Sequence, residues 1–544
     1  MGRGLLAAAL LAAVLIGSRG IRDEGAVSLG GDMPRYLMNG VFLYDFVGSG
    51  TAWTRDSALT YAQRYFTQYP ALSLGHHPPL LPVSLVPFYA AFGVSVFSAR
   101  LALLAFFVLS VVLLYTLARR EYDEAVAGWA CLLFASSPFI ATFAQKVLSE
   151  MPTIAIVLAA MNALTRFKES GRTRGYLLFG VLAMLSLTAR QLAIFMFPAY
   201  AIVLVSDGGY SRFARRDLIG WTVAGAVLVA SIAIGTLILS PFNVAAVRSV
   251  FNHGAGIRAW RAILASIVGV QLTPSLLLVT IAGLLTAFMR RDRRIGTSVY
   301  WVLSVLAGVL LVTGPIEPAR YSILAVPAYC ICAASLASVT MSRGVRWSVT
   351  VMLLFAVLLQ LWAGRSTHPA RTPAYEQAAQ FVLADESSDL HPTALYSPFV
   401  DTGYFIFFVR KHDSARRLVV LRSDKILTTS LMGKLSVEDR IHRPDEIYPL
   451  LTRYGTKFIV IEDRPTGSVV LEWLREELQG PRFIERLRIP FGAEESHVRD
   501  SSLVVYEYKN ATPPDPDAEI DLKIPLVGRE IRVRLSDLRP VTPQ

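Results

Sequence analysis

The feature that most constrains this chain is a succession of apolar segments, each long enough to cross a bilayer. A spanning helix needs about 20 mostly apolar residues. Only 17% of the 544 residues are charged and 53% are hydrophobic, so the composition is that of a polytopic α-helical membrane protein. About 11 spans are expected (11 to 13 with the ambiguous segments), near residues 4–18, 97–118, 126–144, 151–167, 175–189, 191–205, 218–240, 263–289, 296–313, 321–340 and 347–363.

Basic residues are concentrated in every second loop between these segments. Positively charged loops stay on the cytoplasmic side, so the intervening loops and residues 365–544 are predicted to be extracytoplasmic. This topology explains the net charge of +12, and no nucleic-acid partner is expected. The basic loops are Arg119/Arg120, 166–174, 211–217, 290–294 and 342–346.

Two segments allow a second interpretation. The apolar run 80–93 is short and contains Pro82 and Pro87, so we expect a re-entrant or interfacial helix that completes a long outer loop, 20–96. The N-terminal run 4–18 has the length of a signal peptide as well as of a helix. We favour a retained helix, and either interpretation leaves the outer loop outside.

Charged residues of both signs stand at the outer ends of the predicted spans. An ionisable group costs about 2.5–3.5 kcal/mol at the bilayer centre and less near its edge. One such residue would be explained by contact with lipid headgroups, whereas five loops that supply both signs at one level predict a polar cavity. The residues are Asp32, Arg35, His76, His77, Lys146, Glu150, Arg190, Glu317 and Arg320.

These residue types favour phosphate chemistry. Arg35, Arg190 and Arg320 offer forked donors that match a phosphate or pyrophosphate. A general base or a metal ligand could come from Asp32 or Glu150, and the histidines could donate to phosphate or bind a metal. A divalent cation is therefore possible, with Asp32, His76 and Glu150 as candidate ligands. The chain has no Walker loop and no GxGxxG turn between a strand and a helix, so a lipid-linked phosphate is favoured over a soluble nucleotide.

Five stretches resemble the GT-C glycosyltransferases, in particular the bacterial group related to protein O-mannosyltransferases and to the lipid A aminoarabinose transferase. The likeness covers about residues 1–365, and its most specific part is the His-Pro-Pro segment. The stretches are DMPRY (32–36), the segment from HHPPLLP to SSPF (76–139), SEMP (149–152), LTARQLAIFMFP (187–198) and ARYSILAVPAYCICAASLA (319–337).

The resemblance implies a role for each matching residue. Asp32 would be the catalytic carboxylate and Glu150 the second acidic residue. The donor phosphate would be bound by Arg35, His77, Arg190 and Arg320, with His77 and Arg190 at positions where relatives carry lysine. Possible additional site residues are Tyr36, His76, Lys146, Glu317 and Tyr321.

The implied enzyme is a hexosyl- or pentosyltransferase of the cell membrane, with residues 1–364 as its catalytic domain. It would move one sugar, with inversion, from a polyprenyl phosphate to a lipid, glycan or protein acceptor outside. A polysaccharide polymerase or ligase that uses polyprenyl-pyrophosphate donors is the nearest alternative. A lipid-linked sugar transporter or flippase is disfavoured, because no internal repeat is visible and the charges lie away from the expected midplane.

The composition changes after Trp362, and residues 365–544 read as a small α/β domain. Helical spacing over 373–385 and 445–455 alternates with short apolar strands at 393–398, 417–423 and 456–463. Strict alternation near the C-terminus predicts a β-hairpin. We expect this domain to cover the cavity or to shape acceptor choice.

Overall fold

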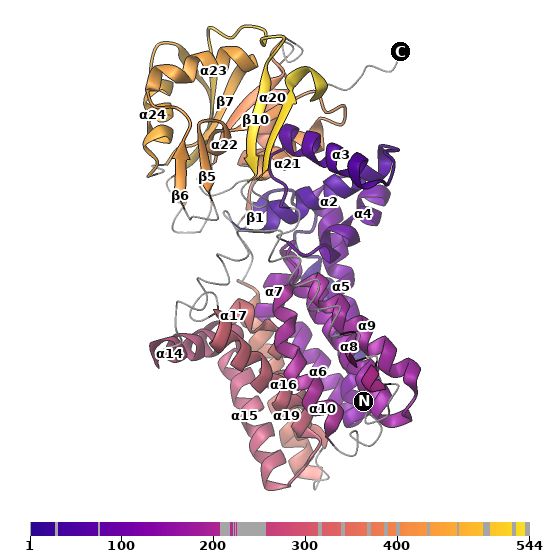
Figure 1. Ribbon diagram of the computed structural model, residues 1–544. Helices are drawn as coiled ribbons and strands as arrows, with labels where there is room; N and C mark the ends of the chain where they lie inside the picture. The colour runs from indigo at the N-terminus through magenta and orange to yellow at the C-terminus, as the bar shows by residue number, and fades with distance from the viewer. Residues whose placement is uncertain are drawn as a thin grey trace.

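The computed structural model describes a lower helical region and an upper α/β region (Figure 1). The described residues are 2–27, 31–73, 77–206, 218–220, 222–223, 225, 257–313, 318–338, 343–366, 371–385, 390–398, 403–431, 436–464, 467–492, 501–524 and 529–538. Most of the predicted span 218–240 lies outside them.

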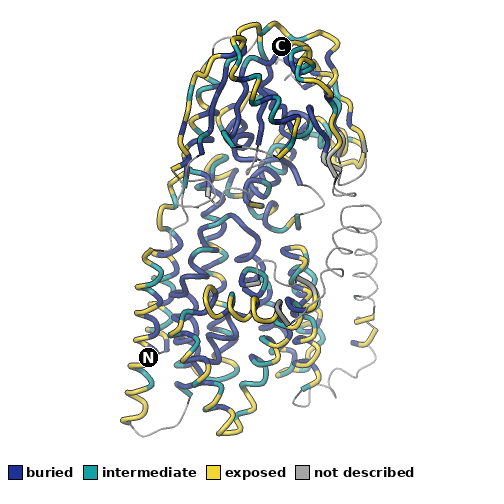
Figure 2. Tube along the Cα trace, turned by 90° about the vertical axis from the view of Figure 1, so that its left-hand side faces the viewer, coloured by how far each residue is buried: buried dark blue, intermediate teal, exposed yellow. Residues whose placement is uncertain are grey.

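The lower region is built from apolar helices that run up and down beside one another (Figure 1). The inner helices are buried, whereas the peripheral ones carry exposed turns (Figure 2). Large apolar side chains such as Leu109, Leu278 and Phe355 are exposed on that periphery, as expected where lipid replaces water. The helices are α1 (Gly2–Gly17), α5 (Val96–Glu121), α6 (Glu124–Ser136), α7 (Pro138–Gln145), α8 (Glu150–Ser170), α9 (Thr173–Ala189), α10 (Phe197–Val205), α14 (Ile257–Ser266), α15 (Pro274–Met289), α16 (Ile295–Gly308), α17 (Pro318–Tyr321), α18 (Val326–Ala334) and α19 (Arg343–Gly364).

Local sequence fixes where α5 begins and ends. The hydroxyl of Ser95 accepts from the Ser98 amide at 3.0 Å, which caps the first turn. Arg119 and Arg120 lie in the last turn, where positive charge is favoured by the helix dipole.

Fewer of the described helices are long and apolar enough to cross a membrane than the sequence analysis predicts. Among the described helices, α5 and Gly344–Gly364 could each cross a membrane, and two bent helix pairs raise that number to four. Further apolar helices of 10–17 residues surround them. The total of 11 to 13 spans therefore stays a prediction.

The span predicted at 263–289 is not one continuous helix. The helix breaks after Gln271, and the two halves meet at 109°; α14 lies crosswise to α15 in Figure 1. Pro274 lacks the amide that would continue the helix, and the Thr273 hydroxyl caps the new one by accepting from Leu276 N at 3.2 Å. Gln271 Nε2 donates to the Ala319 carbonyl at 3.3 Å, which ties the break to α17.

The predicted outer loop is itself helical. It forms α2 (Met33–Gly48), α3 (Arg55–Gln68) and the short apolar helix α4 (Leu80–Phe92), which lie between the two regions in Figure 1. Gly40 lets α2 and α4 approach closely, because a Cβ added there would lie 2.9 Å from the Leu85 side chain.

The upper region contains a five-stranded sheet of order β4-β3-β7-β9-β8. β3 runs parallel to both β4 and β7, and β9 is antiparallel to β7 and β8. Its elements are β3 (Thr393–Ser397), β4 (Val419–Arg422), β7 (Thr456–Glu462), β8 (Phe483–Pro490), β9 (Ser502–Tyr508), α20 (Ala374–Leu383), α21 (Tyr404–His412), α22 (Ser423–Ile426), α23 (Ile447–Tyr454) and α24 (Val469–Leu478).

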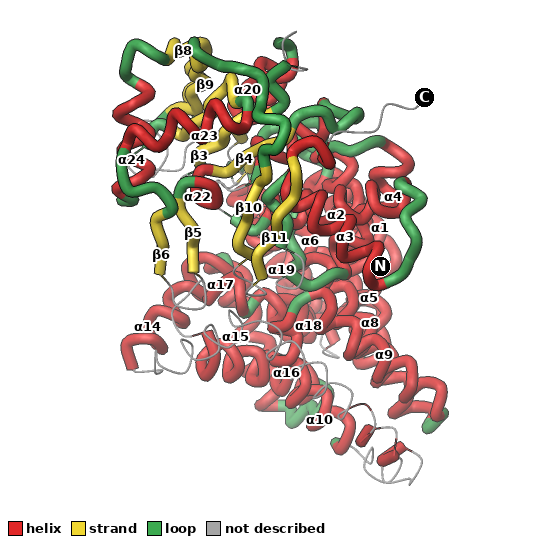
Figure 3. Tube along the Cα trace, turned by 45° about the horizontal axis from the view of Figure 1, so that its top comes forward, coloured by secondary structure: helices red, strands yellow, loops and turns green. Residues whose placement is uncertain are grey.

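The strands and helices predicted in this region are present, and the predicted hairpin is formed by β10 (Glu519–Ile524) and β11 (Arg529–Arg534), which pair antiparallel. Figure 3 shows this hairpin in front of the sheet. Two smaller pairs are β1 (Ala26–Val27) with β2 (Arg371–Thr372), and β5 (Thr428–Leu431) with β6 (Ser436–Asp439).

The two faces of the sheet pack differently. Leu395 and Ile459 belong to one apolar cluster with α23 and α24. Their neighbours Ala394 and Val460 point to the other face, where α20 and α21 pack in the same cluster as the membrane helices. One face of the sheet therefore shares its core with the lower region.

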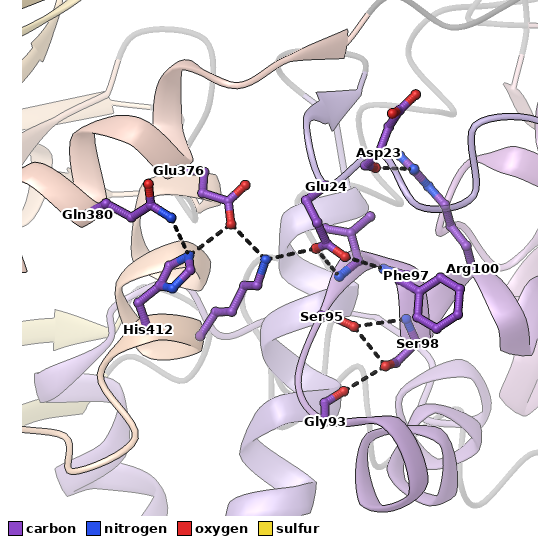
Figure 4. Close-up of polar contacts among 12 residues, drawn as sticks. Asp23, Glu24, Gly93, Ser95, Phe97, Ser98, Arg100, Glu376, Gln380 and His412 are labelled. Carbon is purple, nitrogen blue, oxygen red and sulfur yellow. Dashed lines mark hydrogen bonds and ion pairs between the residues drawn. The ribbon is translucent and has the colours of Figure 1, made fainter.

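A polar network also joins the two regions (Figure 4). The Glu24 carboxylate accepts from the amides of Val96 and Phe97, at 2.9 and 3.1 Å, at the first turn of α5. Lys411 of α21 donates to Glu24 at 3.1 Å and to Glu376 of α20 at 2.7 Å. The start of a membrane helix is thus tied to two helices of the α/β region.

Candidate active site

Two carboxylates and two guanidinium groups meet at the upper end of the membrane helices. Arg320 donates from Nε to Glu150 Oε1 at 2.6 Å and from Nη2 to Asp32 Oδ2 at 3.1 Å. Arg190 forms an ion pair with the same glutamate oxygen, Nη1 to Oε1, at 2.5 Å. One continuous network therefore joins residues that are up to 288 positions apart in the sequence.

Each of these side chains stands at a helix end. Asp32 directly precedes α2, whose first turn contains Pro34, a residue with a φ angle suited to that position. Glu150 is the first residue of α8, Arg190 caps the C-terminal end of α9, and Arg320 lies in the last turn of α17. Carboxylates at helix N-termini and cations at C-termini are favoured by the helix dipoles.

Tyr36 of α2 contacts two further residues next to this network. The Tyr36 hydroxyl donates to Ser149 Oγ at 3.2 Å, and the Tyr36 ring packs against the His77 ring with centroids 4.7 Å apart. His77 Nε2 lies 3.7 Å from Asp32 Oδ1. The histidine is therefore placed beside the carboxylate.

The two carboxylates differ in accessibility. The Glu150 side chain is fully buried, whereas that of Asp32 is 34% exposed. Burial alone would raise the pKa of Asp32, but the nearby His77, Arg320 and Arg35 outweigh burial and hold this pKa below the ordinary aspartate value. Asp32 is therefore an ionised carboxylate that a bound molecule could reach.

Part of the chain matches a known protein family. Residues 76–238 match the family model described as "Dolichyl-phosphate-mannose-protein mannosyltransferase", and this stretch contains His77, Glu150 and Arg190. A search of curated protein sequences found no match to the chain.

Solved structures resemble nearly the whole chain. ArnT from Cupriavidus metallidurans bound to undecaprenyl phosphate is 13% identical, with a TM-score of 0.56 over 92% of this chain and 97% of ArnT. The apo form of ArnT gives a TM-score of 0.54 over 94% of this chain and 99% of ArnT, also at 13% identity. This chain has the GT-C glycosyltransferase fold.

Arabinofuranosyltransferase AftD from Mycobacteria shares the GT-C fold, with 14% identity and a TM-score of 0.53. The alignment covers 96% of this chain but only 41% of AftD. The GT-C resemblance expected from the sequence is confirmed, and the chain is a membrane protein with a C-terminal α/β region.

The structure brings most of the predicted GT-C site residues together. The network and its immediate neighbours contain Asp32, Tyr36, His77, Glu150, Arg190 and Arg320. Tyr321 joins them because the Arg190 guanidinium lies 5.4 Å from the centre of its ring. Arg35 is close enough for its charge to act on Asp32, and Lys146 is half-buried at the C-terminal end of α7. His76 and Glu317 lie outside the described residues.

Ser149 is a member of the site that sequence reasoning missed, although it belongs to the SEMP stretch that carried the resemblance. Its hydroxyl fixes Tyr36, which packs on His77. The signal was its position directly before a predicted span, where a small hydroxyl residue commonly precedes a helix.

The geometry also bears on the predicted metal ligands. Among the described residues, no three His, Cys, Asp or Glu side chains gather in a metal-binding arrangement. Glu150 Oε1 is already bound by Arg190 and Arg320, so a cation at this oxygen would have to displace a guanidinium group. Asp32 is the more accessible of the two candidate carboxylates.

Proposed function

We propose that this protein transfers one sugar from a polyprenyl phosphate to an acceptor at the extracytoplasmic face of the cell membrane. The observation that carries the proposal is the Glu150–Arg320–Asp32 connection, which presents one accessible carboxylate beside several cations. ArnT, with the same fold, was solved with undecaprenyl phosphate bound.

In this mechanism, Asp32 takes the proton of an acceptor hydroxyl, whose oxygen attacks the anomeric carbon opposite the carrier phosphate. The bond between that carbon and the phosphate oxygen breaks, and the electron pair leaves with the polyprenyl phosphate, so the configuration inverts. Arg320 and Arg35 stabilise the charge that develops on the leaving phosphate. The acid Glu150 positions Arg190 and Arg320 and does not act as a base, since it is fully buried and doubly paired.

Donor binding would strengthen the base. A carrier phosphate between the arginines neutralises part of the positive field that now lowers the pKa of Asp32. The carboxylate then binds a proton more readily, in the same complex that holds the sugar. Phosphate recognition and base strength are coupled through Arg320.

The test is transfer by the purified full chain in detergent or nanodiscs. The donor is a monosaccharide polyprenyl phosphate, and the acceptor fraction is identified from the sugar unit lost from cell-envelope lipids and glycoproteins when the gene is deleted. Asp32→Asn should lower transfer by at least about 100-fold, because a positioned base contributes roughly 10²–10⁴. Asp292→Asn is the matched control; this aspartate pairs with Arg294 in the loop between α15 and α16 and should leave transfer unchanged.

Two outcomes would contradict the proposal. Appreciable turnover by a folded Asp32→Asn protein would remove this carboxylate from the reaction. Consumption of a pyrophosphate-linked oligosaccharide, with none of the monosaccharide phosphate, would identify a polymerase or ligase instead.

A further inference from the structure

A cavity of about 360 Å³ lies at the end of the helix bundle that faces away from the α/β region. It is lined by the last turns of α5, α8 and α10 and by the segment that leads into α16. Helix α8 begins at Glu150 of the candidate active site and ends beside the cavity; its 21 residues span about 30 Å. The cavity is therefore separate from the candidate active site and lies toward the lower end of the bundle in Figure 1. The charged residues that line it are Arg120, Glu121, Lys168, Glu169, Arg293 and Arg294.

Positive charge exceeds negative charge around the cavity, since four of these residues are cationic and two are acidic. Arg120 Nη1 donates to Glu169 at 2.8 Å. Arg294 donates to both oxygens of Asp292, at 2.9 and 2.7 Å. Arg293 is exposed, and within the described part of the chain its guanidinium makes no hydrogen bond or ion pair. The positive charge of Arg293 is thus available to a ligand in the cavity.

A carboxylate in the wall of the cavity has one oxygen that accepts no hydrogen bond from the described residues. This oxygen is Glu121 Oε2, which is buried. Leaving a buried acceptor unpaired is unfavourable, so a ligand that brings a donor would be favoured here. Lys168, which also lines the cavity, is half-buried, and its Nζ donates to Ser206 Oγ at 3.2 Å. An ammonium carries three N–H groups, so Lys168 can donate to a ligand as well.

The surroundings of the cavity favour a lipid as the ligand. Val203 of α10 lines the cavity, and Ile202 and Val205 of the same helix are exposed. An apolar surface therefore adjoins the charged cavity, as a molecule with a polar headgroup and acyl chains requires. Lys168 and Arg293 belong to two basic loops that the charge pattern assigns to the cytoplasmic side, where the membrane surface is negative because it carries anionic lipids.

We infer that this cavity binds the headgroup of an anionic phospholipid of the phosphatidylglycerol type, whose phosphate is bound by Arg293 and Lys168. A guanidinium and an ammonium can bind different oxygens of one phosphate. A hydroxyl of the glycerol headgroup donates to Glu121 Oε2, and the acyl chains lie along α10. Basic pockets between membrane helices on the cytoplasmic side are suited to such headgroups. This lipid site does not depend on the proposed function.

The experiment measures lipid binding by the full chain in detergent. Phosphatidylglycerol, phosphatidylcholine and inorganic phosphate are titrated separately, and the rise in unfolding temperature gives the affinity for each probe. Arg293→Ala should weaken the binding of phosphatidylglycerol about tenfold, as expected for the loss of a charged hydrogen bond, and Arg293→Lys should retain most of it. Arg291→Ala is the matched control, because Arg291 is an exposed arginine of the same loop that does not line the cavity.

A second measurement separates lipid binding from a structural role. Without added lipid, Arg293→Ala should unfold at the same temperature as the wild type, because the guanidinium contributes no hydrogen bond or ion pair within the described part of the protein. If this variant unfolds at a lower temperature, Lys168→Gln decides. Its amide can still donate to Ser206 but carries no charge, so the binding of phosphatidylglycerol should weaken again.

The two lipids and the two arginine variants together decide the outcome. Tighter binding of phosphatidylglycerol than of phosphatidylcholine, reduced by Arg293→Ala and not by Arg291→Ala, supports the site. Equal binding of the two lipids, equal losses in the two variants, or binding of inorganic phosphate as tight as that of phosphatidylglycerol overturns it. None of these results depends on sugar transfer, so the lipid site and the proposed reaction can fail separately.

Discussion

At the scale of single residues, burial assigns different roles to two acidic groups that look alike in the sequence. Glu150 is fully enclosed and paired twice, whereas Asp32 is one-third exposed. A buried carboxylate with two cationic partners is an anchor, because removing it leaves uncompensated charges. An exposed carboxylate whose charge is maintained by its neighbours is available to a ligand.

Replacing Glu150 should therefore damage the fold as well as the activity. Glu150→Gln keeps the shape but leaves Arg190, only 8% exposed, without its counter-ion, and breaking such a buried pair costs about 3–5 kcal/mol. Thermal unfolding in detergent measures the loss. Glu485→Gln removes an exposed pair with Arg488 and should cost no more than about 1 kcal/mol; an equal loss in both variants would refute the anchoring role.

The pH dependence of transfer should reflect the pKa of Asp32 both in the free protein and in the complex with the donor. Its pKa in the free protein lies below the ordinary value of 3.8, so kcat/KM should show no acid limb from this group between pH 5 and 7. The acid limb of kcat should lie at higher pH than that of kcat/KM, because bound phosphate offsets the arginines. Superimposable profiles would argue against this coupling.

The stabilising effect of ionised Asp32 on the fold is present above pH 3.8 and is lost as the pH falls through its lower native pKa.

At the scale of elements, Glu24 connects a membrane helix to the α/β region. It caps α5 through two amides and binds Lys411 of α21 (Figure 4). Glu24→Ala should destabilise the protein more than Lys411→Ala, since only the glutamate also satisfies helix amides.

A double-mutant cycle between Glu24 and Lys411 tests the connection. A coupling of about 1 kcal/mol in thermal unfolding is expected for this partly buried pair. Strict additivity of the two single losses would show that the ion pair contributes nothing to docking.

Elements with a strong period were predictable, and those that depend on tertiary contacts were not. The α/β helices and strands follow from their apolar spacing, and the stop of α23 follows from Gly455, which adopts a φ of +65°. The break after Gln271 was missed because an uninterrupted apolar run does not reveal a bend; Pro274 was its only local signal. Helices α2 and α3 were missed because they are held by contacts with the α/β region, such as Asp45 with Arg410 and Gln68 with the Arg416 carbonyl, which no local pattern encodes.

At the scale of the whole molecule, the two regions share one apolar core and one buried ion pair. Arg410 of α21 binds Asp45 of α2 with both side chains less than 10% exposed, and Tyr65 Oη donates to the same carboxylate at 2.7 Å. The α/β region is therefore packed against the outer loop and is connected to it by more than the linker.

Removing this ion pair should loosen the boundary. Arg410→Ala leaves Asp45 buried without its cation, a loss of about 3–5 kcal/mol, and hydrogen exchange should rise in α2 and α21 while α15 stays protected. Arg475→Ala, which removes a pair with Asp463 in the upper region, is the control and should leave α2 unchanged. Unchanged exchange in the Arg410 variant would show that the apolar core alone holds the boundary.

The sequence could predict that these candidate residues lie together, but it could not predict the contacts between them. The sequence placed both signs of charge at one level of the membrane, and resemblance supplied the candidate residues from Asp32 to Arg320. It could not show that one arginine joins both acidic groups, because that contact depends on the relative positions of three helices.

The placement of each site charge at a helix end has a consequence for engineering. No short peptide could carry this chemistry to another scaffold, since the four ends come together only when the whole architecture is assembled. A transplant would have to preserve the angles between those helices, and a shortened version of the protein would lose its candidate active site long before it lost its motifs.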